Sequence, residues 1–181
     1  MKKVALFLAN GFEEIEALGT TDILRRAHID VVTVSITNDK TVKGAHNIKV
    51  EADNTFSNID FTDFDMLILP GGMPGAKNLN ELVELKKLLT EFNSKQKFIA
   101  AICAAPMVLG GLGLLKNKRA TCYPGFEPEL IGATITGENV VVDENIITGK
   151  GPGLVFDFGL RIVEQLLGLQ VRREVQNGLL L

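Results

Sequence analysis

Short apolar runs alternate with longer amphipathic segments along the chain, and this alternation predicts the secondary structure. Runs of mostly apolar residues predict buried strands at residues 4–9, 30–36, 65–70 and 97–102. Apolar and charged residues alternate at 47–52, which predicts a more exposed strand. Apolar residues at helical spacing predict helices at residues 14–27, 82–92 and 153–167. A β-hairpin that turns at 143–145 is predicted over residues 140–149.

The alternation of β and α segments favours an α/β fold in which helices flank a mainly parallel sheet. The first predicted helix has an apolar side that is expected to include Ile15, Leu18, Ile23 and Leu24. No long linker or internal repeat interrupts the pattern, so residues 1–181 are expected to form a single domain. Ligands of such folds bind at the carboxyl ends of the strands, so a site is expected in the turns that follow them.

The longest uncharged run is FIAAICAAPMVLGGLGLL at residues 98–115, with Cys103 near its middle. Its length approaches that of a transmembrane helix, but the run contains Pro106 and three glycines. These residues favour instead a strand at 98–102, a turn, and a helix that starts around Ala104 with Pro106 in its first turn. No membrane span is therefore expected.

Cys103 lies at the junction of this predicted strand and helix. A helix N-terminus presents unpaired N–H groups and a partial positive charge, and both favour the reactive thiolate. A nucleophile on a strand-to-helix turn is also the device of the nucleophile elbow, although the glycines of that motif are missing here. A buried cysteine that acts only as a small hydrophobic residue would give the same pattern. The residue pattern alone leaves both interpretations open.

Three further turns follow predicted strands. The turn with Gly71 and Gly72 could present backbone N–H groups as an oxyanion hole, or could be a plain tight turn. The turn GKGPG at 149–153 could hold an anion but matches no phosphate-loop pattern. Glutamates at 13, 14 and 16 are favoured by the dipole of the first helix, and one of them near a thiol could act as an acid or base.

Composition narrows the classes of function. The charges nearly cancel, with 19 Lys and Arg against 22 Asp and Glu, and the basic residues are scattered. No surface for nucleic acid or an anionic membrane is therefore expected. Two cysteines are too few for a disulfide framework, and with His28 and His46 they show no metal-ligand spacing, so no metal site is expected. MKKVALFLA begins like an export signal, but the apolar run is short and no cleavage site follows, so a cytoplasmic location with reduced thiols is expected.

Six motifs occur in order between residues 9 and 153, within a resemblance that runs from Lys3 to about Gln176. They are ANGFEEIEA at 9–17, DILRRA at 22–27, LPGGMPGAKNL at 69–79, AAICAAP at 100–106, TCYP at 121–124 and GKGPG at 149–153. Together they resemble the ThiJ/PfpI superfamily, in particular its branch that contains the parkinsonism-associated deglycase and bacterial YajL. The resemblance implies a flavodoxin-like three-layer sandwich, usually a homodimer.

The resemblance also implies a catalytic site without a cofactor. It carries the family nucleophile onto Cys103 and the neighbouring acid onto Glu16, which in the family is typically protonated and hydrogen-bonded to the sulfur. The backbone N–H groups of Gly72 and Ala104 would form an oxyanion hole. Four further residues are candidates for lining the site: Gly71, Tyr123, His46 and Pro152.

Three positions depart from patterns within the family. Ala104 stands where protease-like members have a histidine after the nucleophile, so peptidase activity is not expected. Tyr123 stands where some members have a histidine, and because a neutral tyrosine is a poor base, proton transfer falls on Glu16. His46 aligns with a family arginine that reaches the partner's site, which suggests a position at the dimer interface near Cys103. The alternative is a solvated loop histidine.

Two functions follow from the resemblance. The first is a cysteine-dependent glyoxalase or deglycase, in which Cys103 attacks the aldehyde carbon of a 2-oxoaldehyde and Glu16 shuttles the proton. Methylglyoxal would give lactate, and glycated proteins or nucleotides would be related substrates, with a role in oxidative or carbonyl stress. The second is a redox-sensing chaperone, in which oxidation of Cys103 to sulfinate changes partner binding.

Overall fold

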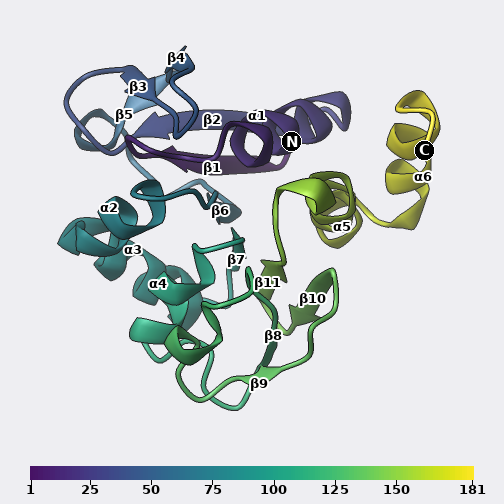
Figure 1. The fold of residues 1–181 in the computed structure, drawn as a ribbon. Coiled ribbons are helices and arrows are strands. Elements are labelled where there is room, and N and C mark those ends of the chain that lie inside the picture. Colours follow the sequence, from purple (N-terminus) through teal and green to yellow (C-terminus); the bar gives the residue numbers. More distant parts are fainter.

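The computed structural model describes residues 1–181, and a seven-stranded sheet forms its centre (Figure 1). The strands of this sheet are β1 (Lys3–Leu8), β2 (Asp30–Ser35), β5 (Asn54–Thr55), β6 (Met66–Leu69), β7 (Phe98–Ile102), β10 (Val140–Asp143) and β11 (Ile146–Gly149). They lie in the order β10-β11-β7-β6-β1-β2-β5. All neighbours run parallel except β10 and β11, which form the expected hairpin. The predicted α/β class with a mainly parallel sheet is confirmed.

Helices cover both faces of this sheet, so the molecule has three layers (Figure 1). On one face α1 (Glu14–Arg26) packs beside α5 (Val155–Leu167), and α6 (Leu169–Gly178) packs against α5. The other face carries α2 (Gly75–Glu81), α3 (Val83–Ser94) and α4 (Pro106–Gly111). Two small sheets complete the fold, one of β3 (Thr41–Lys43) with β4 (Lys49–Glu51) and one of β8 (Arg119–Ala120) with β9 (Thr134–Ile135). Short 3-10 helices lie at Phe56–Asn58, Glu127–Glu129 and Pro152–Leu154.

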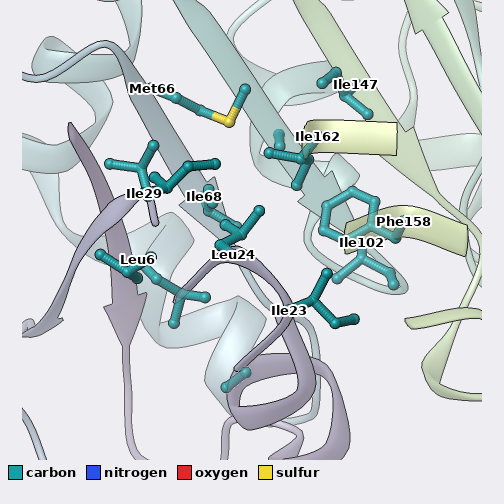
Figure 2. Close-up of a cluster of buried hydrophobic side chains, with 14 of the residues drawn as sticks. Leu6, Ile23, Leu24, Ile29, Met66, Ile68, Ile102, Ile147, Phe158 and Ile162 are labelled. Atoms are coloured by element: carbon teal, nitrogen blue, oxygen red, sulfur yellow. The ribbon is translucent and has the colours of Figure 1, made fainter. Parts of the chain in front are cut away.

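The central strands divide the hydrophobic core into two clusters. Along β1, Leu6 faces the cluster beneath α1 and α5, whereas Phe7 faces the cluster beneath α2, α3 and α4. Successive strand residues point to opposite faces, so a strand covered on both sides is apolar throughout. Figure 2 shows the first cluster, whose members include Ile23, Leu24, Met66, Phe158 and Ile162.

The prediction for the apolar side of the first helix is wrong at its N-terminal half. Ile23 and Leu24 are buried as expected, but Ile15 and Leu18 are 56% and 40% exposed. The start of α1 instead buries the side chains of Glu14 and Glu16. The helical spacing of apolar residues therefore reflects two different surfaces of α1. One surface faces the core and the other faces away from it.

Several elements lie outside the sequence-based predictions, namely α2, α6, β3, β5, β8 and β9. The strand expected at 47–52 is shortened to the three residues of β4, which pairs with β3 rather than with the main sheet. Strands of two or three residues are too short to show a period. The uncharged run at 98–115 forms β7, a turn and α4, and α4 begins at Pro106, two residues later than expected. None of the helices combines the length and the hydropathy needed to cross a membrane.

Candidate active site

Cys103 occupies the turn between β7 and α4, at the carboxyl edge of the sheet. Its φ of 65° lies in the left-handed region, which a non-glycine residue adopts only where its surroundings enforce it. Its N–H donates a hydrogen bond of 2.9 Å to the carbonyl of Gly149, and its carbonyl accepts one of 2.9 Å from the N–H of Tyr123. The sulfur is thus carried by a sharp, fixed strand-to-helix turn, as a nucleophile elbow requires.

Glu16 reaches the same place from the first turn of α1. Its side chain is fully buried, and Oε2 accepts a hydrogen bond of 2.7 Å from the N–H of Gly71. Oε1 is also buried and receives no hydrogen bond from nitrogen or oxygen. The N–H of Glu16 donates at 2.7 Å to the carboxylate of Glu13, the N-cap residue of α1, which fixes where the helix begins.

Two glycines allow the acid and the thiol to meet. A Cβ added to Gly71 would lie 2.7 Å from Cys103 Cβ and 2.8 Å from Glu16 Oε2, so no side chain fits there. Gly72 has a φ of 87°, which favours glycine. The backbone N–H groups of Gly72 and Ala104 lie beside the sulfur and lower the pKa of its thiol. The structure therefore brings together the four residues expected at the centre of a site, Cys103, Glu16, Gly72 and Ala104, with Gly71, a candidate for lining it.

Cys103 and Glu16 ionise as a coupled pair. Burial raises the pKa of Glu16 to about 7, although hydrogen bonds from Gly71 and the thiol act in the opposite direction. Burial and the negative charge of Glu16 raise the pKa of the Cys103 thiol to about 12, against the lowering effect of the two N–H groups. The N–H groups of the turn lower the thiol pKa as expected, but burial and the Glu16 charge outweigh them. Two adjacent buried negative charges oppose each other, so the pair loses one proton near pH 7 and keeps the other.

Tyr123 and Pro152 come from the loops beside the cysteine turn. Besides donating its N–H to Cys103, Tyr123 places its ring against Gly151, where an added Cβ would come within 3.2 Å of Tyr123 Cδ2. The Tyr123 side chain is 46% exposed, at the outer edge of the site. Pro152 begins a 3-10 turn three residues beyond Gly149, the residue that accepts the Cys103 N–H.

His46 lies at the tip of the β3–β4 hairpin, beside the start of α1. Its N–H donates to Glu14 Oε1 at 2.7 Å and its Nδ1 lies 2.8 Å from Glu14 Oε2. The neighbouring Glu13 donates its own N–H to the carbonyl of Gly71 at 2.9 Å, so this cluster and the cysteine site share one turn. The sequence did not reveal the contacts of Glu13 and Glu14 with His46, because 32 residues separate Glu14 from the histidine and no local pattern spans that distance.

Residues 2–165 match the DJ-1/PfpI family. This chain belongs to that family. Protein DJ-1 homolog B of Arabidopsis thaliana is 40% identical over 99% of this chain and 42% of its own length. The chain therefore spans less than half the length of this family member.

Two other family members are similar over nearly their whole length. The glutathione-independent glyoxalase DJ-1 of Schizosaccharomyces pombe is 35% identical over 92% of each chain. A cysteine-to-alanine mutant of a DJ-1 superfamily protein from Salmonella typhimurium has the same fold, with a TM-score of 0.94 and 40% identity over 99% of this chain and 98% of that one. The expected family and its flavodoxin-like sandwich are confirmed.

Proposed function

We propose that the protein is a cofactor-independent glyoxalase that converts 2-oxoaldehydes such as methylglyoxal to 2-hydroxy acids such as lactate. The observation that carries this proposal is the buried carboxyl group of Glu16, whose pKa is about 7, in contact with the Cys103 thiol. Acid–base catalysis is most efficient when the pKa of the group lies near the working pH. The name of the Schizosaccharomyces pombe relative supports the same class of reaction.

The first step joins the cysteine to the aldehyde. Above about pH 7 the Cys103–Glu16 pair carries one proton and one negative charge. With that proton on Glu16, Sγ attacks the aldehyde carbon, an S–C bond forms and the aldehyde oxygen gains the negative charge. The N–H groups of Gly72 and Ala104, which lie beside the sulfur, would stabilise that oxygen until Glu16 protonates it. The product is a thiohemiacetal, and Glu16 is again a carboxylate.

The second step moves hydrogen within the bound substrate. Glu16 takes the proton from the former aldehyde carbon, giving an enediolate, and returns a proton to the neighbouring carbon, while the hydroxyl proton of the first carbon passes to the oxygen of the second. One carbon is thereby oxidised and the other reduced, so neither an external oxidant nor a cofactor is needed. Water then hydrolyses the resulting thioester, which releases the 2-hydroxy acid and restores the Cys103 thiol.

Burial of the reacting groups limits which substrates fit. Cys103 is 8% exposed and Glu16 is fully buried, so the reacting carbon has to be small or at the end of a slender chain. Free 2-oxoaldehydes meet this condition, and so do their adducts on lysine or arginine side chains and on nucleotides. Deglycation of such adducts is therefore part of the proposal, with a role in carbonyl stress. The reaction needs a reduced thiol, which suits the cytoplasm.

We also propose a homodimer that forms through an apolar patch of Ile15, Leu18 and Ile48. Ile15 and Leu18 lie one turn apart on α1, and Ile48 is 52% exposed on the β3–β4 hairpin. The backbone of Ile48 hydrogen-bonds the Glu14 carboxylate, so the hairpin and α1 present these side chains together. Covering exposed apolar area stabilises an interface by about 25 cal/mol per Å². His46 would border this interface.

The experiment that tests the activity measures lactate formed from methylglyoxal by untagged protein without glutathione. Wild type and Cys122→Ser are expected to turn over, because Cys122 is a second buried cysteine outside the site. Cys103→Ser and Glu16→Gln are expected to lose at least about 100-fold in kcat. Absence of lactate with wild type, or full turnover by Cys103→Ser, would overturn the proposal.

A further inference from the structure

Three side chains outside the cysteine site converge where α1 meets the β3–β4 hairpin. His46 Nδ1 lies 2.8 Å from Glu14 Oε2 and 3.8 Å from Glu13 Oε1. One potential ligand atom from each of the three residues lies within 4.8 Å of the other two. The fold creates this group from residues that are far apart in sequence, so the absence of ligand spacing in the sequence did not exclude it.

The carboxylate of Glu13 has one oxygen that lacks a hydrogen-bond donor. The side chain is 10% exposed, and Oε2 accepts the N–H of Glu16 at 2.7 Å. Oε1 faces His46 Nδ1 at 3.8 Å, which is too long for a hydrogen bond. This oxygen accepts no hydrogen bond and is not among the fully buried unpaired atoms, so it is accessible to a ligand. Together with the Glu14 carboxylate it presents negative charge to a cation.

The carboxylate of Glu14 is held in a fixed orientation beside it. Its side chain is 6% exposed, and Oε1 accepts the N–H of His46 at 2.7 Å. Gly44 lies against this carboxylate so closely that a side chain at that position would collide with it. Oε2 is thereby directed at the imidazole. With both carboxylates ionised, the group keeps an excess negative charge even when His46 is protonated.

We propose that Glu13, Glu14 and His46 form a binding site for a divalent transition-metal ion, for which Zn²⁺ is the probe. Two carboxylate oxygens and one imidazole nitrogen suit Zn²⁺ and its neighbours, whereas Mg²⁺ and Ca²⁺ prefer oxygen ligands alone. Ligand atoms about 2.0–2.1 Å from a tetrahedral Zn²⁺ lie about 3.3 Å from one another. The 2.8 Å and 3.8 Å contacts lie on either side of this value, and the His46 side chain is 71% exposed and free to adjust. Water completes the coordination.

Binding exchanges a proton for the metal and links the site to the cysteine site. The proton that Nδ1 shares with Glu14 leaves for solvent or moves to Nε2, because a metal ligand nitrogen carries no proton. The same Glu13 carboxylate that binds the ion through Oε1 holds the N–H of Glu16 through Oε2. An ion here would therefore stabilise the start of α1. The site does not depend on the proposed glyoxalase activity.

The test is isothermal titration calorimetry with ZnCl₂ on untagged Cys103→Ser protein, in which the thiol of the cysteine site cannot compete for the metal. We expect one equivalent to bind and the melting temperature to rise with added Zn²⁺. In the same background, His46→Gln is expected to weaken binding at least about tenfold. His28→Gln is the matched control, because His28 is the other histidine of the chain, is exposed and lies at the far end of α1. This variant is expected to bind Zn²⁺ with unchanged affinity.

Glu13→Gln separates the role of ligand from the role of helix cap. Its amide oxygen can still accept the N–H of Glu16, but it lacks the charge that attracts a cation, so a weaker affinity is expected with unchanged stability in the absence of metal. The proposal is overturned if no saturable binding occurs below about 1 mM Zn²⁺. It is equally overturned if His46→Gln and Glu13→Gln bind Zn²⁺ as tightly as His28→Gln.

Discussion

The N–H of Gly71 donates a hydrogen bond of 2.7 Å to Oε2 of Glu16, across 55 residues of the sequence. This bond joins the turn after β6 to the first turn of α1. It holds the carboxyl group against Cys103, and it requires that Gly71 have no side chain. The glycine turn thus positions the Glu16 carboxyl group and the Cys103 thiol at the same time.

Gly71→Ala is expected to lose most of the methylglyoxal turnover and about 1–3 kcal/mol of stability, because the added methyl group has to displace Cys103 or Glu16. The measurements are kcat/KM and the free energy of unfolding in urea. Gly153→Ala is the control, since an added Cβ there meets no atom within 4 Å and the backbone has no positive φ. Unchanged kcat/KM in Gly71→Ala would show that the close approach is not needed for turnover.

The activity is expected to rise with pH through about 7, the pKa of Glu16. Below this pH both the Glu16 carboxyl group and the Cys103 thiol are protonated, so no carboxylate is available to accept the thiol proton. The rate should fall about tenfold for each pH unit below 7. A profile of kcat/KM against pH checks this, and a midpoint near the ordinary glutamate pKa would contradict the coupling of Glu16 with Cys103.

The stability of the protein is expected to change with pH in the opposite sense. Folding raises the pKa of Glu16 from 4.5 to about 7, so between these values the folded protein binds the proton more strongly than the unfolded chain. The stability contribution is complete below pH 4.5 and is lost as the pH rises to 7, by about 3 kcal/mol. Urea denaturation of wild type and Glu16→Gln at pH 5 and pH 8 separates this contribution from those of other groups. A wild type whose stability changes with pH as little as that of the glutamine variant would contradict the prediction.

The elements that carry Cys103 and Gly71 were predictable because each is a local pattern. Strand β7 is fully apolar and is followed by a short turn that ends at Pro106. Strand β6 is fully apolar and is followed by two glycines. Each pattern is visible within a few residues. The ionisation of the thiol was not predictable from the turn, since it depends on burial beneath other segments and on the Glu16 charge from a distant helix. The contact between Glu14 and His46 was hidden for the same reason.

The exposed part of α1 shows a second limit of sequence patterns. Ile15 and Leu18 fit the helical period of a core-facing surface as well as Ile23 and Leu24 do, yet they face away from the core. An apolar residue in the pattern indicates only that its side chain is expected to be shielded from water. The pattern does not indicate whether the same chain or a second chain shields it. A surface that packs against a second chain gives the same periodic signal as one that packs against the sheet.

Leu18→Asp is therefore expected to shift the protein from dimer to monomer, because it places a charge in the proposed patch of Ile15, Leu18 and Ile48. Light scattering coupled to size-exclusion chromatography measures the mass directly. Ile131→Asp is the control, since Ile131 is 61% exposed and lies near β9, away from α1. A wild type that is monomeric at high concentration, or a Leu18→Asp variant that stays dimeric, would contradict the proposed interface.

Mild peroxide treatment tests the redox-sensing alternative at the same sulfur. Thiolate is the form that peroxide oxidises, and two equivalents of peroxide convert it through sulfenate to sulfinate. The pKa of both thiols is raised, to about 12 for Cys103 and to about 11 for Cys122. Cys103, however, lies beside Glu16, whose carboxylate has a pKa of about 7 and can accept the thiol proton, and beside two N–H groups that stabilise the thiolate. Mass spectrometry is therefore expected to find two added oxygens on Cys103 and none on Cys122, with glyoxalase activity falling in proportion. Selective oxidation of Cys103 in a protein that shows negligible turnover beforehand would favour the sensor over the enzyme.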